Sequence, residues 1–156
     1  RDSWASRGLG DVYKRQLDTI KQLKSSKQNI VQNINPHLMM IKEYGYVIFT
    51  NQKIKDYYLK IDEEGEYELD NHTYLHITKN ICNFITSSGK LWYNINMLPI
   101  IIRTRKNGDK IKTKKGSISV SDYLTNHKIP YLQRKQILLL CDKDDLPIAI
   151  LGYIIK

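Results

Sequence analysis

Short runs of β-branched and aromatic residues, separated by turn-forming residues, constrain the fold of this chain most strongly. The runs 44–50, 57–61, 65–69 and 72–78 are rich in Tyr, Ile, Val and Phe, which are the residue types that strands favour. Asp, Glu and Asn fill the short gaps between the later runs, as turns require. This part of the chain therefore predicts an antiparallel meander.

The second half of the sequence adds further strands and two short helices. An apolar segment within 91–105 is followed by Asn107–Gly108, a tight-turn signal. Ser119 or Ser121 can cap a short helix, and Pro130 suits the first turn of another. The closing strands are expected at 136–141 and 148–155. The predicted fold class is α/β (α+β), with mostly antiparallel sheet and short helices.

The N-terminal third divides into segments of different character. Residues 6–16 read SRGLGDVYKRQ, which resembles one continuous translated frame of a transposase sequencing adapter. We therefore expect 1–16 to be an artefactual leader that is not part of the natural fold; a natural basic leader is the alternative. Residues 17–36 are expected to be the end of a helical domain followed by an Asn-rich linker, and 37–156 to form the C-terminal domain.

A dense group of basic residues lies between Arg103 and Lys135. This segment contains ten Lys or Arg residues against two acidic ones, which gives it a net charge of +8, and the whole chain carries +9. Lys and Arg that neutralise phosphates release condensed counterions and so produce strong, salt-dependent binding. The basic residues that we select as candidate contacts are Arg103, Arg105, Lys110, Lys112, Lys114, Lys115, Lys128 and Arg134.

This clustered charge indicates an anionic partner, and nucleic acid fits better than a membrane. Arg103 and Arg105 alternate along an expected strand and would share one face, while 106–115 is expected to be a mobile loop that follows a phosphate backbone. A membrane surface would favour a basic amphipathic helix with a continuous apolar face. We therefore expect binding to nucleic acid and not to a membrane. The longest apolar runs fall well short of the roughly 18 residues needed to span a bilayer, so a soluble protein is expected, and the expected localisation is cytoplasmic.

Other motifs in the sequence have simpler structural explanations. Cys82 and Cys141 lie in apolar surroundings without C-x-x-C spacing, so buried free thiols are expected. His72 and His76 would lie about 13 Å apart along a strand, too far to share a metal. The run 87–90, Ser-Ser-Gly-Lys, lacks the remaining residues of a phosphate loop and is expected to be a turn. No catalytic residue and no metal ligand is predicted.

The second half of the chain resembles the C-terminal domain of the bacterial tRNA(Ile)-lysidine synthetase family. The resemblance rests on LPIIIRTRKNGDKI, VSDYL, HKIPYLQR and ILLL followed by ILGYIIK, in this order. It covers about 98–155 and extends more weakly back to Tyr44, while 17–36 stands where the family's middle helical domain would end. The family commonly carries paired lysines just before the short helix; here 117–119 is Ser-Ile-Ser, and the lysines come earlier, at Lys114 and Lys115.

The resemblance implies a role in tRNA modification. The parent enzyme would be a ligase that uses ATP to adenylate an anticodon cytidine of isoleucine tRNA, after which lysine displaces AMP. Its N-terminal catalytic domain carries a serine-glycine-glycine-x-aspartate-serine loop that does not occur in this sequence. ATP and Mg²⁺ are therefore expected in that domain and no cofactor in this chain, whose implied role is to hold the tRNA acceptor stem. A homodimer formed through the full-length enzyme remains open.

Less specific readings compete with this one. Arg103 could simply pair with Asp109 across a turn, where an exposed ion pair contributes only about 0 to 1 kcal/mol. Trp92, Tyr93 and Tyr123 fit packing in a core or at an edge better than base stacking. The domain could also be a structural or dimerisation module of a nucleotide-modifying enzyme, with incidental charge. An independent small enzyme would need a convergent pocket of shifted ionisable groups, and the sequence offers none.

Overall fold

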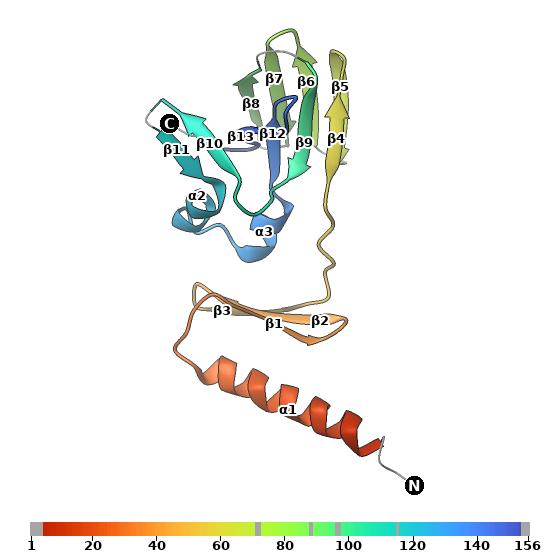
Figure 1. The fold of residues 1–156 in the computed structure, drawn as a ribbon, viewed down its shortest axis with the longest axis vertical. Coiled ribbons are helices and arrows are strands. Elements are labelled where there is room, and N and C mark those ends of the chain that lie inside the picture. Colours follow the sequence, from red (N-terminus) through yellow and green to blue (C-terminus); the bar gives the residue numbers. More distant parts are fainter. Residues whose placement is uncertain (1–4, 71–72, 88, 96–97, 115, 154–156) are drawn as a thin grey trace. The chain divides into compact units, whose positions relative to one another are not determined.

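The protein consists of two compact units rich in antiparallel sheet. The computed structural model describes residues 5–70, 73–87, 89–95, 98–114 and 116–153, and the chain divides into units Arg1–Lys53 and Ile54–Lys156. Figure 1 shows the order of the elements along the chain. All paired strands in the described residues are antiparallel and the helices of the second unit are short, which confirms the predicted α+β class.

The first unit combines one helix with a three-stranded sheet. Its elements are α1 (Ala5–Lys24), β1 (Ile30–Asn35), β2 (Leu38–Glu43) and β3 (Tyr46–Thr50), with the strands in the order β1-β2-β3. Strand β1 therefore lies within the segment 17–36, in the part that was expected to be an Asn-rich linker. Its residues alternate between half-buried and exposed along the strand, a period of two that the Asn-rich composition concealed. The helix also starts within the expected leader; the origin of 1–16 stays a prediction.

A lysine of β2 completes the end of α1. Lys42 Nζ donates hydrogen bonds to the carbonyl oxygens of Gln22 and Leu23, at 3.4 and 3.0 Å, and also to that of Ser25. The last carbonyls of a helix have no partner within the helix and carry partial negative charge. The ammonium group therefore stabilises the helix end and ties it to the sheet.

The second unit contains two four-stranded sheets. The first has the order β13-β12-β9-β4 and the second is the meander β5-β6-β7-β8. The strands of the first sheet are β4 (Tyr58–Ile61), β9 (Ile100–Thr104), β12 (Leu138–Cys141) and β13 (Pro147–Ile150). Those of the second are β5 (Gly65–Asp70), β6 (Thr73–Thr78), β7 (Ile81–Thr86) and β8 (Gly89–Asn94).

Two hydrophobic clusters use the opposite faces of the β13-β12-β9-β4 sheet. Ile100 and Ile102 of β9 pack in a cluster with Leu75 and Cys82 of the meander, so this cluster joins the two sheets. Ile101, between them, points the other way and packs in a second cluster. The alternation follows from the two-residue period of a strand. Both faces of β9 are thus buried, which explains its uninterrupted apolar run.

A small hairpin and one short helix cover the second face, and another short helix follows in the chain. These elements are β10 (Lys110–Thr113), β11 (Gly116–Ser119), α2 (Val120–Asn126) and α3 (Tyr131–Gln136). Ile111 of β10 and Val120 and Leu124 of α2 belong to the second cluster. This packing places β10, β11 and α2 on the same side of the sheet, as Figure 1 shows. None of the helices formed by the described residues combines the length and apolar character that a bilayer crossing requires.

The meander and the helix starts were predicted with different success. The run 44–50 belongs to the first unit as β3, and the run at 57–61 pairs with β9 as β4 rather than with its neighbour in sequence. Of the four runs that were expected to form the meander, only the last two belong to it, as β5 and β6; β7 and β8 complete it. The predicted cap of α2 is confirmed, because the Ser119 side chain accepts a hydrogen bond from the Asp122 amide, and α3 follows Pro130 as expected.

Candidate nucleic-acid interface

The β10–β11 hairpin presents lysines on its outer side. Ile111 is only 3% exposed and points into the second cluster, whereas its neighbours Lys110 and Lys112 are exposed. Across the hairpin, Lys110 stands opposite Ser119 and Lys112 opposite Ser117. Because side chains alternate along a strand, both lysines lie on the side facing away from the core. We call Lys110, Lys112 and the exposed Lys114 that follows β10 the basic hairpin surface.

The expected mobile loop at 106–115 is therefore wrong for its second half. Lys110–Thr113 is a strand, held by the pairing with β11 and by the burial of Ile111. The hairpin turns before Gly116, whose φ of +133° favours glycine, and the Thr113 hydroxyl donates to the Gly116 carbonyl at 2.9 Å. Lys115 lies outside the described residues.

The base of the hairpin is fixed on both strands. The Val120 amide donates to the Asp109 carbonyl at 3.0 Å, so the residue before β10 is bonded to the residue after β11. Gly108, at φ +88°, makes the tight turn that leads into Asp109. The sequence Asn107–Gly108 predicted this turn, and the structure shows that it positions a carboxylate directly before the first lysine of the hairpin.

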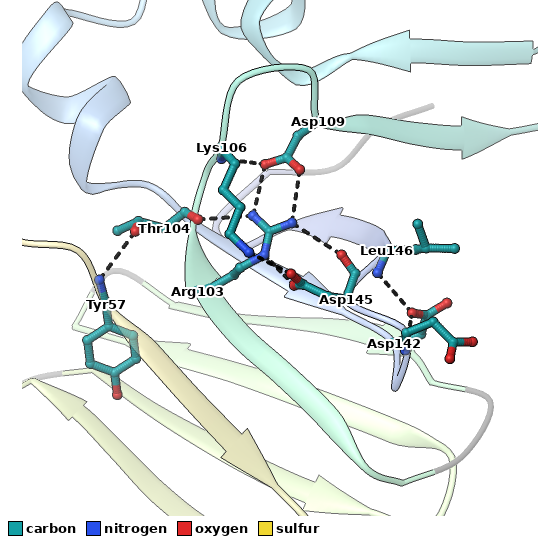
Figure 2. Close-up of polar contacts among 9 residues, drawn as sticks. Tyr57, Arg103, Thr104, Lys106, Asp109, Asp142, Asp145 and Leu146 are labelled. Atoms are coloured by element: carbon teal, nitrogen blue, oxygen red, sulfur yellow. Dashed lines mark hydrogen bonds and ion pairs between the residues drawn. The ribbon is translucent and has the colours of Figure 1, made fainter.

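Arg103 is buried inside a cluster of ion pairs, shown in Figure 2. Its side chain is 3% exposed, and its Nη1 and Nη2 donate to the two carboxylate oxygens of Asp109, each at 2.9 Å. Nε donates to the Asp145 carboxylate, Nη2 also to the Asp145 carbonyl at 3.2 Å, and Nη1 also to the Thr104 carbonyl at 3.1 Å. A guanidinium has five N–H donors. All five are engaged, so Arg103 has no donor left for a phosphate.

Asp145 brings a second cation into this cluster. Lys106 Nζ lies 2.6 Å from its Oδ2 and is itself 60% exposed. Asp145 has φ +60°, a left-handed conformation that Asp tolerates better than most residues. The preceding Asp142 holds this turn, because its carboxylate accepts the amides of Asp144 and Leu146, each at 2.9 Å. Two cations and two carboxylates make the cluster neutral as a whole.

The same contacts shift the ionisation of the cluster. Hydrogen bonding to Asp109 raises the pKa of the Arg103 guanidinium above its usual value, although burial opposes the shift. Burial alone would raise the pKa of the Asp109 carboxyl, but the hydrogen bonds from Arg103 and from the Lys106 amide outweigh it and lower that pKa. The pKa of Asp145 is likewise lowered, because the bonds from Lys106 and Arg103 outweigh burial. Arg103 and both carboxylates are therefore charged at neutral pH.

A hydrogen bond brings together Arg105, which follows β9, and Arg134 of α3. Arg105 follows β9 and its Nε donates to the Arg134 carbonyl at 3.0 Å, while Arg134 Nη1 donates to the Thr125 hydroxyl of α2 at 3.0 Å. Both arginines are half-buried. Arg103, which we expected on the same face as Arg105, is instead inside the cluster with Asp109.

Lys128 lies at the end of α2. It is exposed and has φ +54°, the left-handed conformation that commonly ends a helix. Its amide donates to the Thr125 carbonyl at 2.9 Å. Beside it, His127 stacks on Tyr123 with ring centroids 4.1 Å apart, so this histidine is engaged in packing.

Other residues singled out in the sequence have structural positions. Cys82 and Cys141 are buried free thiols, as predicted, and burial raises the pKa of each to about 12. Tyr93 is buried; its hydroxyl donates to the Ile150 carbonyl at the end of β13 and accepts from the Gly152 amide just after it. Trp92, on the edge strand β8, is 66% exposed. His72 lies outside the described residues. Within those residues, no three His, Cys, Asp or Glu side chains gather as a metal site.

Sequence reasoning missed the part of the cluster contributed by the β12–β13 turn. Asp145 is 42 residues from Arg103 in sequence, and it lies between the two expected closing strands, where no site residue was predicted. A signal exists in retrospect: the run Asp142, Asp144, Asp145 is acidic beside a basic segment. This acidic run does not indicate which of the three carboxylates contacts Arg103, because that contact depends on the left-handed conformation at Asp145.

Comparison with known proteins gives one informative similarity. No protein-family model matches the chain. The chain is 26% identical over 153 residues to tRNA(Ile)-lysidine synthase from Clostridioides difficile (strain 630). The match covers 88% of this chain and 33% of that protein, so the chain spans about a third of the length of this relative.

Proposed function

We propose that the second unit binds tRNA, as part of an enzyme of the tRNA(Ile)-lysidine synthase kind. The proposed contacts are the basic hairpin surface together with Arg105, Lys115, Lys128 and Arg134. Arg103 belongs to the same segment but has its five donors occupied. We propose that it acts by shaping this surface rather than by touching RNA.

The observation that carries the proposal is the geometry of Lys110 and Lys112. They are exposed on one side of a short strand whose inward residue, Ile111, is buried. Two residues along a strand span about 7 Å, so the two ammonium groups start from a fixed spacing on a rigid base. Neutralisation of successive phosphates requires cations that are both accessible and close together. A surface of incidental charge needs neither property.

An A-form RNA stem is the proposed partner. Its major groove is too narrow for side chains to read, so proteins bind such stems through phosphates, 2′-hydroxyls and shape. Lysines on a hairpin suit this mode, and the similarity to a tRNA(Ile)-lysidine synthase supports tRNA as the source of the stem. We propose the acceptor stem of isoleucine tRNA, in the cytoplasm. The ATP- and Mg²⁺-dependent ligation is proposed for the larger part of such an enzyme that this chain does not match.

A charge-reversal experiment tests this function. The double variant K110E/K112E of the 156-residue chain is compared with K79E/K90E, which makes the same change at two exposed lysines of the meander. Affinity for an isoleucine tRNA transcript is measured by fluorescence anisotropy at several salt concentrations. We expect only K110E/K112E to lose affinity, with the slope of log K against log salt reduced by about 2, since each phosphate contact contributes about 0.9.

Two further outcomes are informative. Equal affinities of K110E/K112E and the unchanged chain would refute the proposed interface and favour a structural or dimerisation module. If K110E/K112E loses affinity as expected, competition with separate acceptor-stem and anticodon-stem hairpins identifies the stem that is bound. The acceptor-stem hairpin should compete, and competition by the anticodon hairpin alone would overturn the proposed stem.

A further inference from the structure

The buried ion cluster joins two turns that lie far apart in the sequence. Asp109 lies between the β9–β10 turn and the first residue of β10, and Asp145 lies in the β12–β13 turn. Arg103 donates two hydrogen bonds to the Asp109 carboxylate and one to the Asp145 carboxylate, as Figure 2 shows. A two-stranded hairpin alone is at best marginally stable in water. The orientation of the β10–β11 hairpin therefore depends on the contacts that fix the residues at its base.

Asp109 is the residue that transmits this hold to the lysines. Its carboxylate is clamped by two bonds from Arg103, its carbonyl accepts the Val120 amide, and Lys110 follows it directly. A bidentate arginine–carboxylate pair fixes orientation as well as distance. The side chain of Asp109 is only 9% exposed. It can therefore affect RNA binding only indirectly, by positioning the neighbouring residues.

We propose that Asp109 and Asp145, both held by Arg103, are positioning residues for RNA binding by the basic hairpin surface. This inference rests on the proposed function and adds two carboxylates to it. Neither carboxylate attracts a polyanion. Their contribution is to keep Lys110 and Lys112 in one orientation, so that both ammonium groups meet phosphates without an ordering cost on binding.

Removal of either carboxylate should change the RNA affinity in the direction opposite to that expected from net charge alone. Removing a carboxylate from a basic segment raises its net charge by one, and within the Debye length of about 8 to 10 Å this should strengthen RNA binding. If the carboxylate positions the lysines, its removal should weaken binding although every lysine is retained. Asp109→Asn and Asp145→Asn therefore separate the two explanations by the direction of the change.

Asp144 provides a matched control for Asp145. It lies in the same turn and is exposed, and only its backbone amide, not its carboxylate, takes part in the hydrogen bonds shown for this turn. Asp144→Asn makes the same change of charge one residue away from the cluster. It should bind RNA as tightly as the unchanged chain or slightly more tightly.

The experiment measures the affinity of the 156-residue chain and of D109N, D145N and D144N for an isoleucine tRNA transcript over a range of salt. For D109N and D145N we expect about a fivefold or greater loss of affinity, as is typical of coupling between sites, and a shallower salt slope. Circular dichroism melts establish that each variant is folded at the assay temperature. Affinity of a folded D109N equal to or above that of the unchanged chain overturns the inference.

D145N keeps the inference testable if D109N does not fold. Its carboxylate is 34% exposed, and the pair between Arg103 and Asp109 remains intact. D145N binding as tightly as D144N would overturn the inference. A failure of the proposed function looks different: K110E/K112E would then have no effect on affinity, whatever D109N and D145N do.

Discussion

Replacement of Arg103 by methionine should destabilise the second unit by about 3 to 5 kcal/mol, the cost of removing one partner from a buried ion pair. Methionine keeps an unbranched side chain but supplies none of the five donors. The Asp109 carboxylate, 9% exposed, would keep the Lys106 amide as its remaining donor in this cluster. Asp145 would keep Lys106 and is partly solvated, so most of the loss arises at Asp109.

The size of the effect makes it easy to measure. One kcal/mol shifts the midpoint of a domain of 60 to 100 residues by about 4 to 8 °C, and the second unit is of similar length, Ile54–Lys156. A loss of 3 kcal/mol therefore predicts a midpoint at least about 12 °C lower. Scanning calorimetry and urea unfolding measure it, with Arg105→Met as a control that removes one hydrogen bond, to the Arg134 carbonyl.

A double-mutant cycle tests the cause of the effect. If the uncompensated carboxylate dominates, R103M/D109N should be more stable than the sum of the two single losses predicts, with a coupling of about 0.5 to 3 kcal/mol. A loss below about 1 kcal/mol for R103M, the value of an exposed ion pair, would refute the reasoning. It would mean that the guanidinium is solvated and not held as the structure has it.

Two other perturbations test the same part of the fold. The pKa values of Asp109 and Asp145 are lowered in the folded state. Their contribution to the free energy of unfolding is therefore complete above the unfolded pKa of about 4 and is lost as pH falls through the lower folded values. Thermal melts from pH 7 to pH 3 should show this loss of stability, and D109N/D145N should lose less stability over the same range. An equal loss in that variant would contradict the assignment. Ile111→Ala should cost about 2 to 5 kcal/mol in urea unfolding, because Ile111 is 3% exposed in the second cluster; a cost under about 1 kcal/mol would show that the hairpin is not packed on the sheet.

The parts of the fold that could be predicted from the sequence depend on local chemistry. Ser119 caps α2 because its hydroxyl accepts an amide three residues on, and this pattern is visible in the sequence alone. The same holds for Pro130 before α3 and for the Asn107–Gly108 turn. Each of these signals lies within a few residues of the structure that it produces.

The features that could not be predicted depend on distant partners. Arg103 and Asp109 were recognised as a pair that could form, but the exposed pair considered from sequence differs from the buried, five-donor cluster completed by Asp145. The strand at Lys110–Thr113 was taken for a loop because a single apolar residue, Ile111, marks its inward side. A pattern of one residue has no period. The strand is formed by pairing with β11 and by the packing of Ile111 in the second cluster.

The candidate contacts divide into exposed residues, which the basic composition predicted, and a buried residue whose partners are distant in sequence. Exposure of Lys110, Lys112, Lys114 and Lys128 agrees with the accessibility that phosphate binding needs, while the charge of Arg103 is used inside the protein. Composition counts both kinds of residue equally. The burial of one arginine changes the hypothesis from a uniform basic segment to a basic hairpin mounted on a neutral ionic base.

The salt dependence of tRNA binding by the 156-residue chain tests the central claim most directly. Log K for an isoleucine tRNA transcript is measured against log salt concentration at neutral pH. Three to seven phosphate contacts, from the basic hairpin surface alone or with Arg105, Lys115, Lys128 and Arg134, predict a slope of about −3 to −6. A slope near zero, or no binding at low salt, would contradict the account.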